Sequence, residues 1–140
     1  MTVRTRIFLT TTVVLALGGL VVLLPLGARS LEAREVVVIA RQMSFYVVGQ
    51  AATANPTIQM APGERIRLTL ISADPGFDHD FAVTAWGVRT PVLHGEGRTS
   101  IVIEAPETPG KVPYVCTIHA SMMTGTIEVL ASGPASVPAR

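Results

Sequence analysis

From residue 35 onward, short apolar runs alternate with turn-forming residues. Val36–Ile39 and Phe45–Val48 are rich in β-branched or aromatic side chains, and Ile66–Leu70 alternates strictly between apolar and polar positions, as a half-buried strand does. Further strands are expected at Thr57–Met60, Phe77–Trp86, Ser100–Glu104, Val112–Cys116 and Thr126–Leu130. Strands this short, separated by Gly/Pro turns, indicate an all-β antiparallel sandwich or Greek-key barrel.

Three segments interrupt this pattern. Residues 87–97 contain Pro91 and three glycines and are expected to form an irregular loop. The segment around Ala120–Met123 is the only candidate helix after residue 30, and it is weak. Pro113 falls inside a predicted strand, where proline is tolerated at an edge or a bulge.

The N-terminus has a different character. Arg4 and Arg6 precede an uncharged apolar run that extends from residue 7 to residue 26. A basic start, an apolar run and small residues near its end describe an export signal. The run is also long enough to span a bilayer as an uncleaved anchor helix. Both interpretations place the following domain outside the cytoplasm, in the periplasm or an equivalent space.

We therefore divide the chain into a signal or anchor at 1–30, one domain at 31–130 and a flexible tail at 131–140. The whole chain has 11 basic and 10 acidic residues. Without the three arginines of the first segment, eight basic residues face ten acidic ones, a net charge of −2. No basic patch for nucleic acid is expected.

The only cysteine lies in a stretch rich in metal-binding side chains. Cys116, His119, Met122 and Met123 fall within eight residues. Sulfur and imidazole donors favour copper, and two histidines, one cysteine and a weak axial methionine form blue-copper electron-transfer sites. The second histidine has to come from elsewhere. His79 begins an apolar run 37 residues before Cys116, which leaves room for two strands that could bring both to one end of a sandwich.

Each of these residues has an ordinary explanation when it is taken alone. A free cysteine is often a small buried hydrophobe, and methionine often fills a core. His79 could lie in a surface turn. The spacing and the β-rich flanks together favour a metal site. His94 lies in the 87–97 loop without a partner at ligand spacing, so we expect it at the solvent-exposed rim.

The stretch from Tyr114 to Val129 reads Tyr-x-Cys-x₂-His-x₃-Met-x-Gly-x-Ile-x-Val. With a histidine leading an upstream strand, it resembles the cupredoxin family and is similar to the copper domains of nitrous oxide reductase and cytochrome oxidase subunit II. Supporting turns are Asn55-Pro56-Thr57, Pro62-Gly63-Glu64, Asp74-Pro75-Gly76 and Pro109-Gly110. The resemblance implies a Greek-key β-sandwich with one copper ion per chain, bound by His79, Cys116, His119 and Met123.

The resemblance also selects the methionine. Family members place a glycine two residues after the axial ligand, and Gly125 follows Met123 at that distance, which favours Met123 over Met122. Two departures stand out. A binuclear site needs two cysteines spaced Cys-x₃-Cys, but Val112 occupies the earlier position, so the site is mononuclear. Asp80 follows His79 where many small blue proteins have asparagine, and a carboxylate that faces the copper would lower its reduction potential.

Other chemistries fit the sequence less well. Structural zinc is held by four Cys or His ligands, and here a thioether would have to complete the set. A Cys–His nucleophile pair needs an orienting group and an oxyanion hole, which the sequence does not supply. Multicopper catalysis requires more histidines than the three present. The chain is therefore not expected to be an enzyme.

The preferred function is one-electron transfer by a monomer that meets redox partners transiently near His119. Ile118 and Met122 could form an apolar rim for docking, since transient redox interfaces are small. An anchor at residues 7–26 would tether the domain to a membrane. The alternative is a copper carrier or assembly factor that delivers the metal to an oxidase or reductase.

Overall fold

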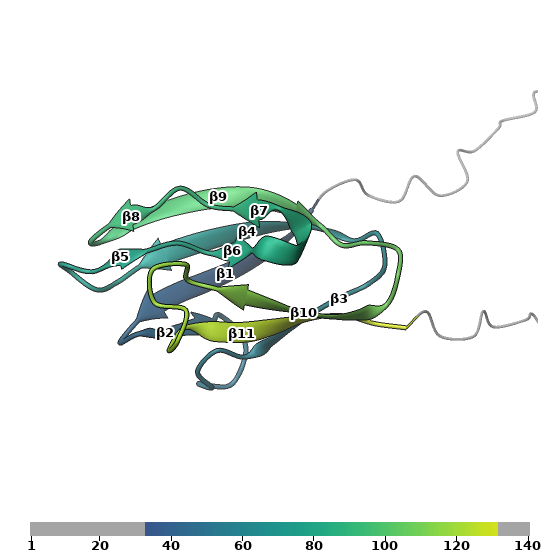
Figure 1. Ribbon diagram of the computed structural model, residues 1–140, viewed down its shortest axis with the longest axis horizontal. Coiled ribbons are helices and arrows are strands. Elements are labelled where there is room, and N and C mark those ends of the chain that lie inside the picture. Colours follow the sequence, from purple (N-terminus) through teal and green to yellow (C-terminus); the bar gives the residue numbers. More distant parts are fainter. Residues whose placement is uncertain (1–32, 132–140) are drawn as a thin grey trace, which may run out of the picture.

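The computed structural model describes residues 33–131, which form a β-sandwich (Figure 1). Its strands are β1 (Arg34–Arg41), β2 (Ser44–Val47), β3 (Thr57–Met60), β4 (Arg65–Ser72), β5 (Asp78–His79), β6 (Ala82–Val83), β7 (Val88–Arg89), β8 (Leu93–His94), β9 (Gly97–Glu104), β10 (Gly110–Val115) and β11 (Thr124–Val129). The only helical element in residues 33–131 is one 3-10 turn, η1 (Thr84–Trp86). The all-β prediction is confirmed.

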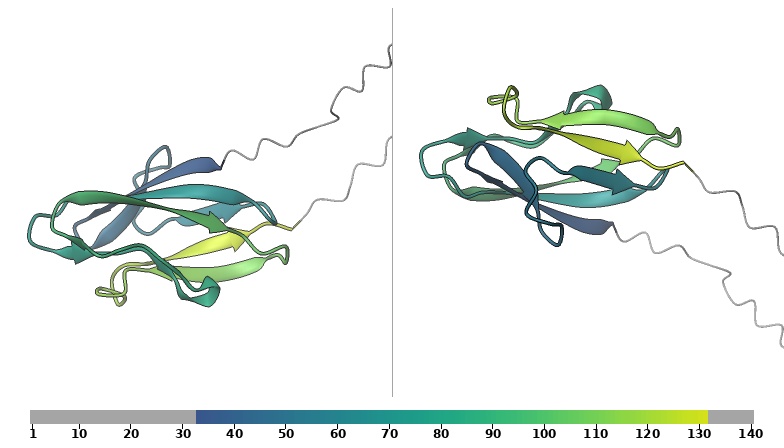
Figure 2. Two further views of the ribbon diagram at one scale, coloured as in Figure 1. Left: turned by 90° about the horizontal axis from the view of Figure 1, so that it is seen from above. Right: turned by 90° about the horizontal axis from the view of Figure 1, so that it is seen from below.

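Two sheets face each other, as the two views of Figure 2 show. The first has the order β2-β1-β4-β9 and the second β3-β11-β10-β6-β7, while β5 and β8 pair separately. Two pairings, β1–β4 and β3–β11, are parallel. The expectation of a purely antiparallel sandwich is therefore wrong. After the β1–β2 hairpin the chain crosses to the second sheet as β3 and returns to the other side of β1, and a long crossover of this kind permits parallel pairing.

The core lies between the sheets. Along β4, Ile66, Leu68 and Leu70 are fully buried, which matches the alternation read from the sequence. Phe81 and Tyr114 stack with ring centroids 4.8 Å apart, and Phe45 lies 5.6 Å from each of them. Aromatic packing at these distances stabilises a core beyond simple area burial. This cluster belongs to the same hydrophobic core as Cys116.

The segment 77–97 differs from its prediction. The expected strand Phe77–Trp86 is divided into β5, β6 and η1, and the expected irregular loop that follows contains β7 and β8. The strand is interrupted at Asp80, whose side chain is turned into the protein and hydrogen-bonded there. The reversal after η1 is made by Gly87, which has a φ of 65°. Glycine adopts this left-handed conformation without steric cost.

The Ala120–Met123 segment and Pro113 are the two other irregularities expected in the β pattern. The segment around Ala120–Met123 is a hydrogen-bonded turn and not a helix. Pro113 lies in β10 opposite Thr126 of β11, and the pairing of β10 with β6 involves Val115 alone. Pro113 therefore has a ladder partner on one side only, which agrees with the expected edge position.

The β5–β8 pair and the β10–β11 loop lie at one end of the sandwich, and residues 33 and 131 lie at the other (Figure 1). The signal or anchor predicted at 1–30 and the tail from residue 132 onward lie outside the described residues. Within residues 33–131, no helix is long and apolar enough to cross a membrane.

Candidate metal centre

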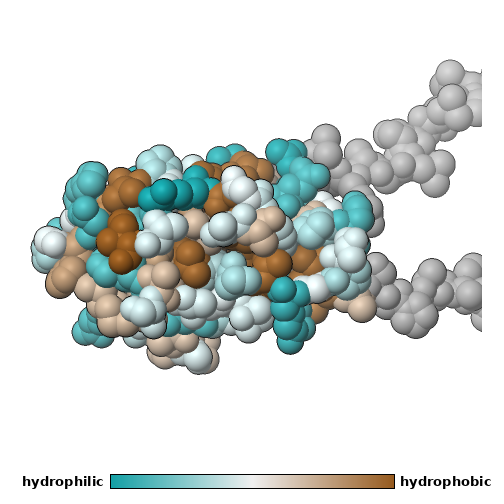
Figure 3. Space-filling view, in the orientation of Figure 1, coloured by the Kyte–Doolittle hydropathy of each residue, from teal (hydrophilic) through white to brown (hydrophobic). Residues whose placement is uncertain are grey.

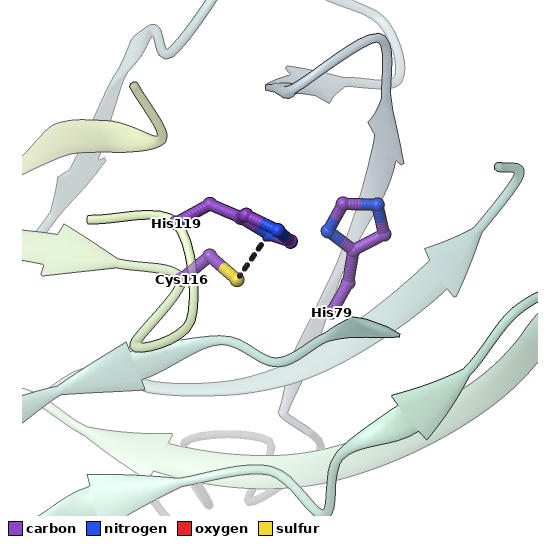
Figure 4. A group of neighbouring side chains, drawn as sticks. All are labelled: His79, Cys116 and His119. Carbon is purple, nitrogen blue, oxygen red and sulfur yellow. Dashed lines mark hydrogen bonds between the residues drawn. The ribbon is translucent and has the colours of Figure 1, made fainter. Parts of the chain in front are cut away.

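Three side chains that the sequence singled out meet at this end of the sandwich. Ligand atoms of His79, Cys116 and His119 all lie within 4.8 Å of one another. His79 is the last residue of β5, and the other two belong to the loop between β10 and β11. Figure 4 shows both imidazole rings beside the sulfur of Cys116. The fold therefore joins two segments 37 residues apart into one potential metal site.

The two ring nitrogens of His79 differ in their hydrogen bonding. Its Nε2 lies 3.3 Å from Oδ2 of Asp74, whereas its buried Nδ1 has no hydrogen-bond partner among residues 33–131. The carboxylate favours the tautomer with the proton on Nε2, which leaves the Nδ1 lone pair available. Buried polar atoms without a partner are rare and call for an explanation. A metal-binding histidine commonly donates its other N–H to a carboxylate, and this arrangement has the same form.

Cys116 supplies a sulfur that is shielded from solvent. The residue is fully buried, and its Sγ lies 3.7 Å from Nδ1 of His119. Burial raises the pKa of the Cys116 thiol, although backbone N–H groups of Asp80, Ile118 and His119 oppose this shift. A metal ion deprotonates a thiol that coordinates it. The same N–H groups would then stabilise the resulting thiolate.

The Cys116–Met123 segment, here called the ligand loop, is closed by its own backbone. The N–H of Cys116 donates to the carbonyl of Met123, and the N–H of His119 donates to the carbonyl of Cys116. The carbonyl of His119 in turn accepts from Met122 and Met123. These bonds bring both ends of the loop together, so its side chains are held in place without a metal. The backbone of residues 116–123 forms bends and turns and no helix, so Cys116, His119 and Met123 do not lie along one face of a helix.

Two residues from outside the loop hold it in place. Asp80 is fully buried and accepts hydrogen bonds from the backbone N–H and the hydroxyl of Thr117. On the other side, Asn55 donates from Nδ2 to the carbonyl of Met122 and accepts from the N–H of Phe45. Asn55 has a φ of 51°, a conformation that asparagine tolerates better than most residues. The sequence showed Asn55 only as part of a turn.

The Asp80 carboxylate is fully engaged by hydrogen bonds inside the protein. It is directed to Thr117 and to Arg89, whose Nε lies 2.6 Å away. Burial alone would raise the pKa of Asp80, but hydrogen bonds from Thr117 and Arg89, together with the arginine charge, lower it below its ordinary value. The group is therefore an ionised, fully hydrogen-bonded carboxylate. Neither Asp74 nor Arg89 was recognised from the sequence, although an aspartate five residues before a candidate ligand is a possible signal.

The two methionines differ in burial. Met123 is fully buried in the core, whereas Met122 is 52% exposed. A side chain in contact with Cys116 and His79 has to point inward, so the burial favours Met123. His94 is exposed and hydrogen-bonds through Nδ1 to Asp78, in agreement with the rim position expected for it.

His119 is the candidate ligand nearest to solvent. Its ring is half-buried and meets the edge of Phe77, with centroids 6.4 Å apart. Phe77, Ile118 and Met122 are each close to half exposed. Figure 3 shows apolar surface at the end that holds β5 and β8. Phe77 was not included in the predicted rim, because the sequence does not show that it lies beside His119.

The donor set of this site fits copper better than zinc. One buried cysteine sulfur and two imidazoles are three of the ligands of a mononuclear blue-copper site, whose weak axial ligand is a methionine. In a structural zinc site the fourth position is also Cys or His. The free Nδ1 of His79 is the feature that a bound ion would explain.

No protein-family model matches the sequence, and no curated protein matches it. Solved structures do match. The copper protein rusticyanin matches with a TM-score of 0.51 and 27% identity over 69% of this chain and 76% of that chain. An auracyanin from the photosynthetic bacterium Roseiflexus castenholzii has a TM-score of 0.55 and 14% identity, over 71% and 98% of the two chains. Auracyanin A, a "blue" copper protein from Chloroflexus aurantiacus, has a TM-score of 0.54 and 11% identity, over 71% of this chain and 100% of that chain.

This chain has a cupredoxin fold. The two auracyanins support the fold alone, because their sequence identity is low, and the rusticyanin match has the same architecture at higher identity. The expectation that this chain is not an enzyme agrees with its likeness to the copper protein rusticyanin. The suggested similarity to nitrous oxide reductase and cytochrome oxidase subunit II stays a prediction.

Proposed function

We propose that this protein binds one copper ion through His79, Cys116, His119 and Met123 and transfers single electrons outside the cytoplasm. The main observation is the buried Nδ1 of His79, which lacks a partner and belongs to a group whose ligand atoms lie within 4.8 Å of one another. The bound metal would supply the one-electron chemistry. The likeness to rusticyanin, which is a copper protein, supports this assignment.

The protein contributes a rigid set of donors. The ligand loop is fixed by its internal hydrogen bonds and by Asp80 and Asn55. His79 is fixed by Asp74. A site that is already formed changes little when the charge of its metal changes, so a small structural reorganisation would accompany electron transfer. This rigidity favours electron transfer over copper delivery, which requires a site that opens to release the metal.

His119 is the proposed route to a partner. It is the ligand candidate nearest to solvent, and the exposed Phe77, Ile118 and Met122 form an apolar surface with it. Residue 33 lies at the opposite end of the sandwich (Figure 1). An anchor at residues 7–26 would leave this surface free to meet a redox partner, as would a cleaved signal.

The proposal can be tested by titrating the purified protein with Cu(II) and recording visible absorption, electron paramagnetic resonance and voltammetry. We expect one equivalent of copper, an intense thiolate-to-copper absorption band and a reversible one-electron wave. A colourless protein that prefers Cu(I) and transfers it to an acceptor protein would instead support a copper carrier. If copper does not bind stoichiometrically, both functions are wrong.

A further inference from the structure

An ion pair between Asp80 and Arg89 lies directly beside the proposed ligands. The distance from Nε of Arg89 to Oδ2 of Asp80 is 2.6 Å. The Asp80 side chain is fully buried, whereas that of Arg89 is 52% exposed. Asp80 follows His79 in the chain and is hydrogen-bonded to Thr117, the neighbour of Cys116. One carboxylate is therefore adjacent to two of the proposed ligands.

The partner of this carboxylate distinguishes it from the two other acidic groups nearby. Asp74 is hydrogen-bonded to His79 itself, and Asp78 pairs with the exposed His94. Of these three carboxylates only Asp80 forms an ion pair with an arginine. A guanidinium group stays charged at every pH at which the protein is folded. If such a partner is removed, a buried charge is left uncompensated.

Arg89 reaches Asp80 from a fixed position. It is the second residue of β7 and lies opposite Ala82 of β6 in the antiparallel register. The turn that leads into β7 is set by Gly87, whose left-handed conformation ends η1. The backbone therefore brings the half-exposed guanidinium to Oδ2 of Asp80, an oxygen that also accepts the hydroxyl of Thr117 in the ligand loop.

We propose that Arg89 is a positioning residue for the copper site, which holds Asp80 against Thr117 and offsets its negative charge. An uncompensated carboxylate would stabilise Cu(II) relative to Cu(I) and lower the reduction potential. With Arg89 in place, the protein keeps the two hydrogen bonds that Asp80 accepts from Thr117 of the ligand loop, and it avoids most of this fall in reduction potential. The inference rests on the proposed copper function, but it concerns a residue that binds no metal.

The test compares reduction potentials of the copper-loaded full chain and the variants R89Q, R89K, D80N and D80N/R89Q. For R89Q we expect the equilibrium to move roughly tenfold toward Cu(II), a fall of about 59 mV for a one-electron couple. R89K keeps the charge and should retain most of the wild-type potential. The double variant has lost both charges and should return close to the wild-type value.

Arg98→Gln is a suitable control, because Arg98 is an exposed arginine in the first sheet that lies 3.8 Å from Glu35. It should not change the potential. If R89Q folds poorly, D80N and D80N/R89Q still isolate the charge of Arg89, since neither contains a buried carboxylate at this position. D80N/R89Q should have a lower reduction potential than D80N, because it lacks the positive charge of Arg89. Equal potentials in that pair, or an R89Q potential equal to that of the wild type, would overturn it.

Thermal unfolding of the metal-free variants supplies a second readout. If the ion pair holds Asp80 in place, the effects of D80N and R89Q on Tm should be non-additive, as for residues in contact. Additive effects would contradict the positioning role. A wild-type protein that binds no copper would overturn the proposed function together with this inference. Bound copper with potentials that do not respond to Arg89 would overturn this inference alone.

Discussion

The carboxylate of Asp80 accepts the backbone N–H of Thr117 at 2.6 Å and its hydroxyl at 2.7 Å. These two hydrogen bonds join the β5–β6 segment to the ligand loop across 37 residues of sequence. His79 and Cys116 are the chain neighbours of the bonded pair. The distance between two proposed ligands is therefore controlled by residues that donate no ligand atom.

The first prediction concerns acid stability. The pKa of Asp80 in the folded protein is below its ordinary value of 3.8, so the unfolded chain binds more protons in the interval between the two values. The stabilisation from Asp80 is complete above about pH 4 and is lost as the pH falls through the lowered pKa. Urea unfolding of D80N between about pH 2 and pH 6 should show a shallower acid limb than that of the wild type.

Thr117→Val provides a comparison for this measurement. It removes one of the hydrogen bonds that lower the pKa of Asp80 but keeps the carboxylate. The pKa of Asp80 in the folded variant should lie closer to 3.8, so the acid-induced loss of stability should begin at the same pH as in the wild type, be smaller and end at a higher pH. An acid limb in D80N as steep as that of the wild type would show that Asp80 does not contribute.

The second prediction concerns Asp74 as the partner of His79. Asp74→Asn replaces a charged acceptor by a neutral one, which makes the imidazole less basic. Loss of an outer partner of this kind usually weakens metal binding by about 10- to 100-fold. Competition with a chelator should show weaker copper binding, and voltammetry should show a raised potential. Asp78→Asn is the matched control, because Asp78 pairs only with the exposed His94, and it should retain wild-type affinity.

The third prediction separates the two methionines. Met123→Leu should raise the reduction potential and alter the copper spectrum, because it removes a buried thioether beside the site. Met122→Leu changes an exposed side chain and should leave both unchanged. Voltammetry and electron paramagnetic resonance of the two variants show which methionine is the axial ligand. If Met122→Leu raises the potential and Met123→Leu does not, the assignment of the axial ligand is wrong.

The fourth prediction concerns Asn55. Asn55→Asp keeps the acceptor for Phe45 and the tolerance for a positive φ, but it puts an oxygen against the carbonyl of Met122. Loss of this hydrogen bond should cost about 1–3 kcal/mol in the metal-free protein, as measured by urea unfolding. Copper should also dissociate faster, since the end of the loop next to Met123 is less constrained. Asn55→Gly keeps the backbone conformation and also lacks the donor, so it should show the same faster dissociation.

The fifth prediction concerns Gly125, which lies opposite Tyr114 in the β10–β11 register. A Cβ at this position would overlap the Tyr114 ring, whose hydroxyl donates to the carbonyl of Pro56. Gly125→Ala should destabilise the protein by about 1–3 kcal/mol, as overpacking does. Gly110 lies in β10 with open space around it, so Gly110→Ala should be nearly neutral in thermal unfolding. Equal effects of both variants would contradict the role given to Tyr114.

Much of the site could be predicted because its ligand residues have distinctive chemistry and lie close together in sequence. Cys116, His119 and Met123 belong to one loop, and the small number of histidines left His79 as the best remaining candidate. The alternation along Ile66–Leu70 also identified a strand whose inner face is buried. These features depend on local spacing and side-chain chemistry, which the sequence shows directly.

The residues that support the ligands could not be found in this way. Asp74, Asn55 and Arg89 are ordinary polar residues of turns and edge strands, and their roles depend on which distant atoms the fold places beside them. The sequence showed that Asp80 follows His79, but it could not show that its carboxylate faces Thr117 and an arginine.

The sequence by itself determined the β class of the domain, most of its core strands and the candidate donors, because hydrophobic periodicity and ligand chemistry are local properties. Only the tertiary structure decided that β1 pairs in parallel with β4, that Met123 is buried while Met122 is exposed, and that Asp80 forms an ion pair with Arg89. Each of these depends on contacts between segments far apart in the chain. Such contacts arise from the packing of the whole sandwich, and no short stretch of sequence specifies them.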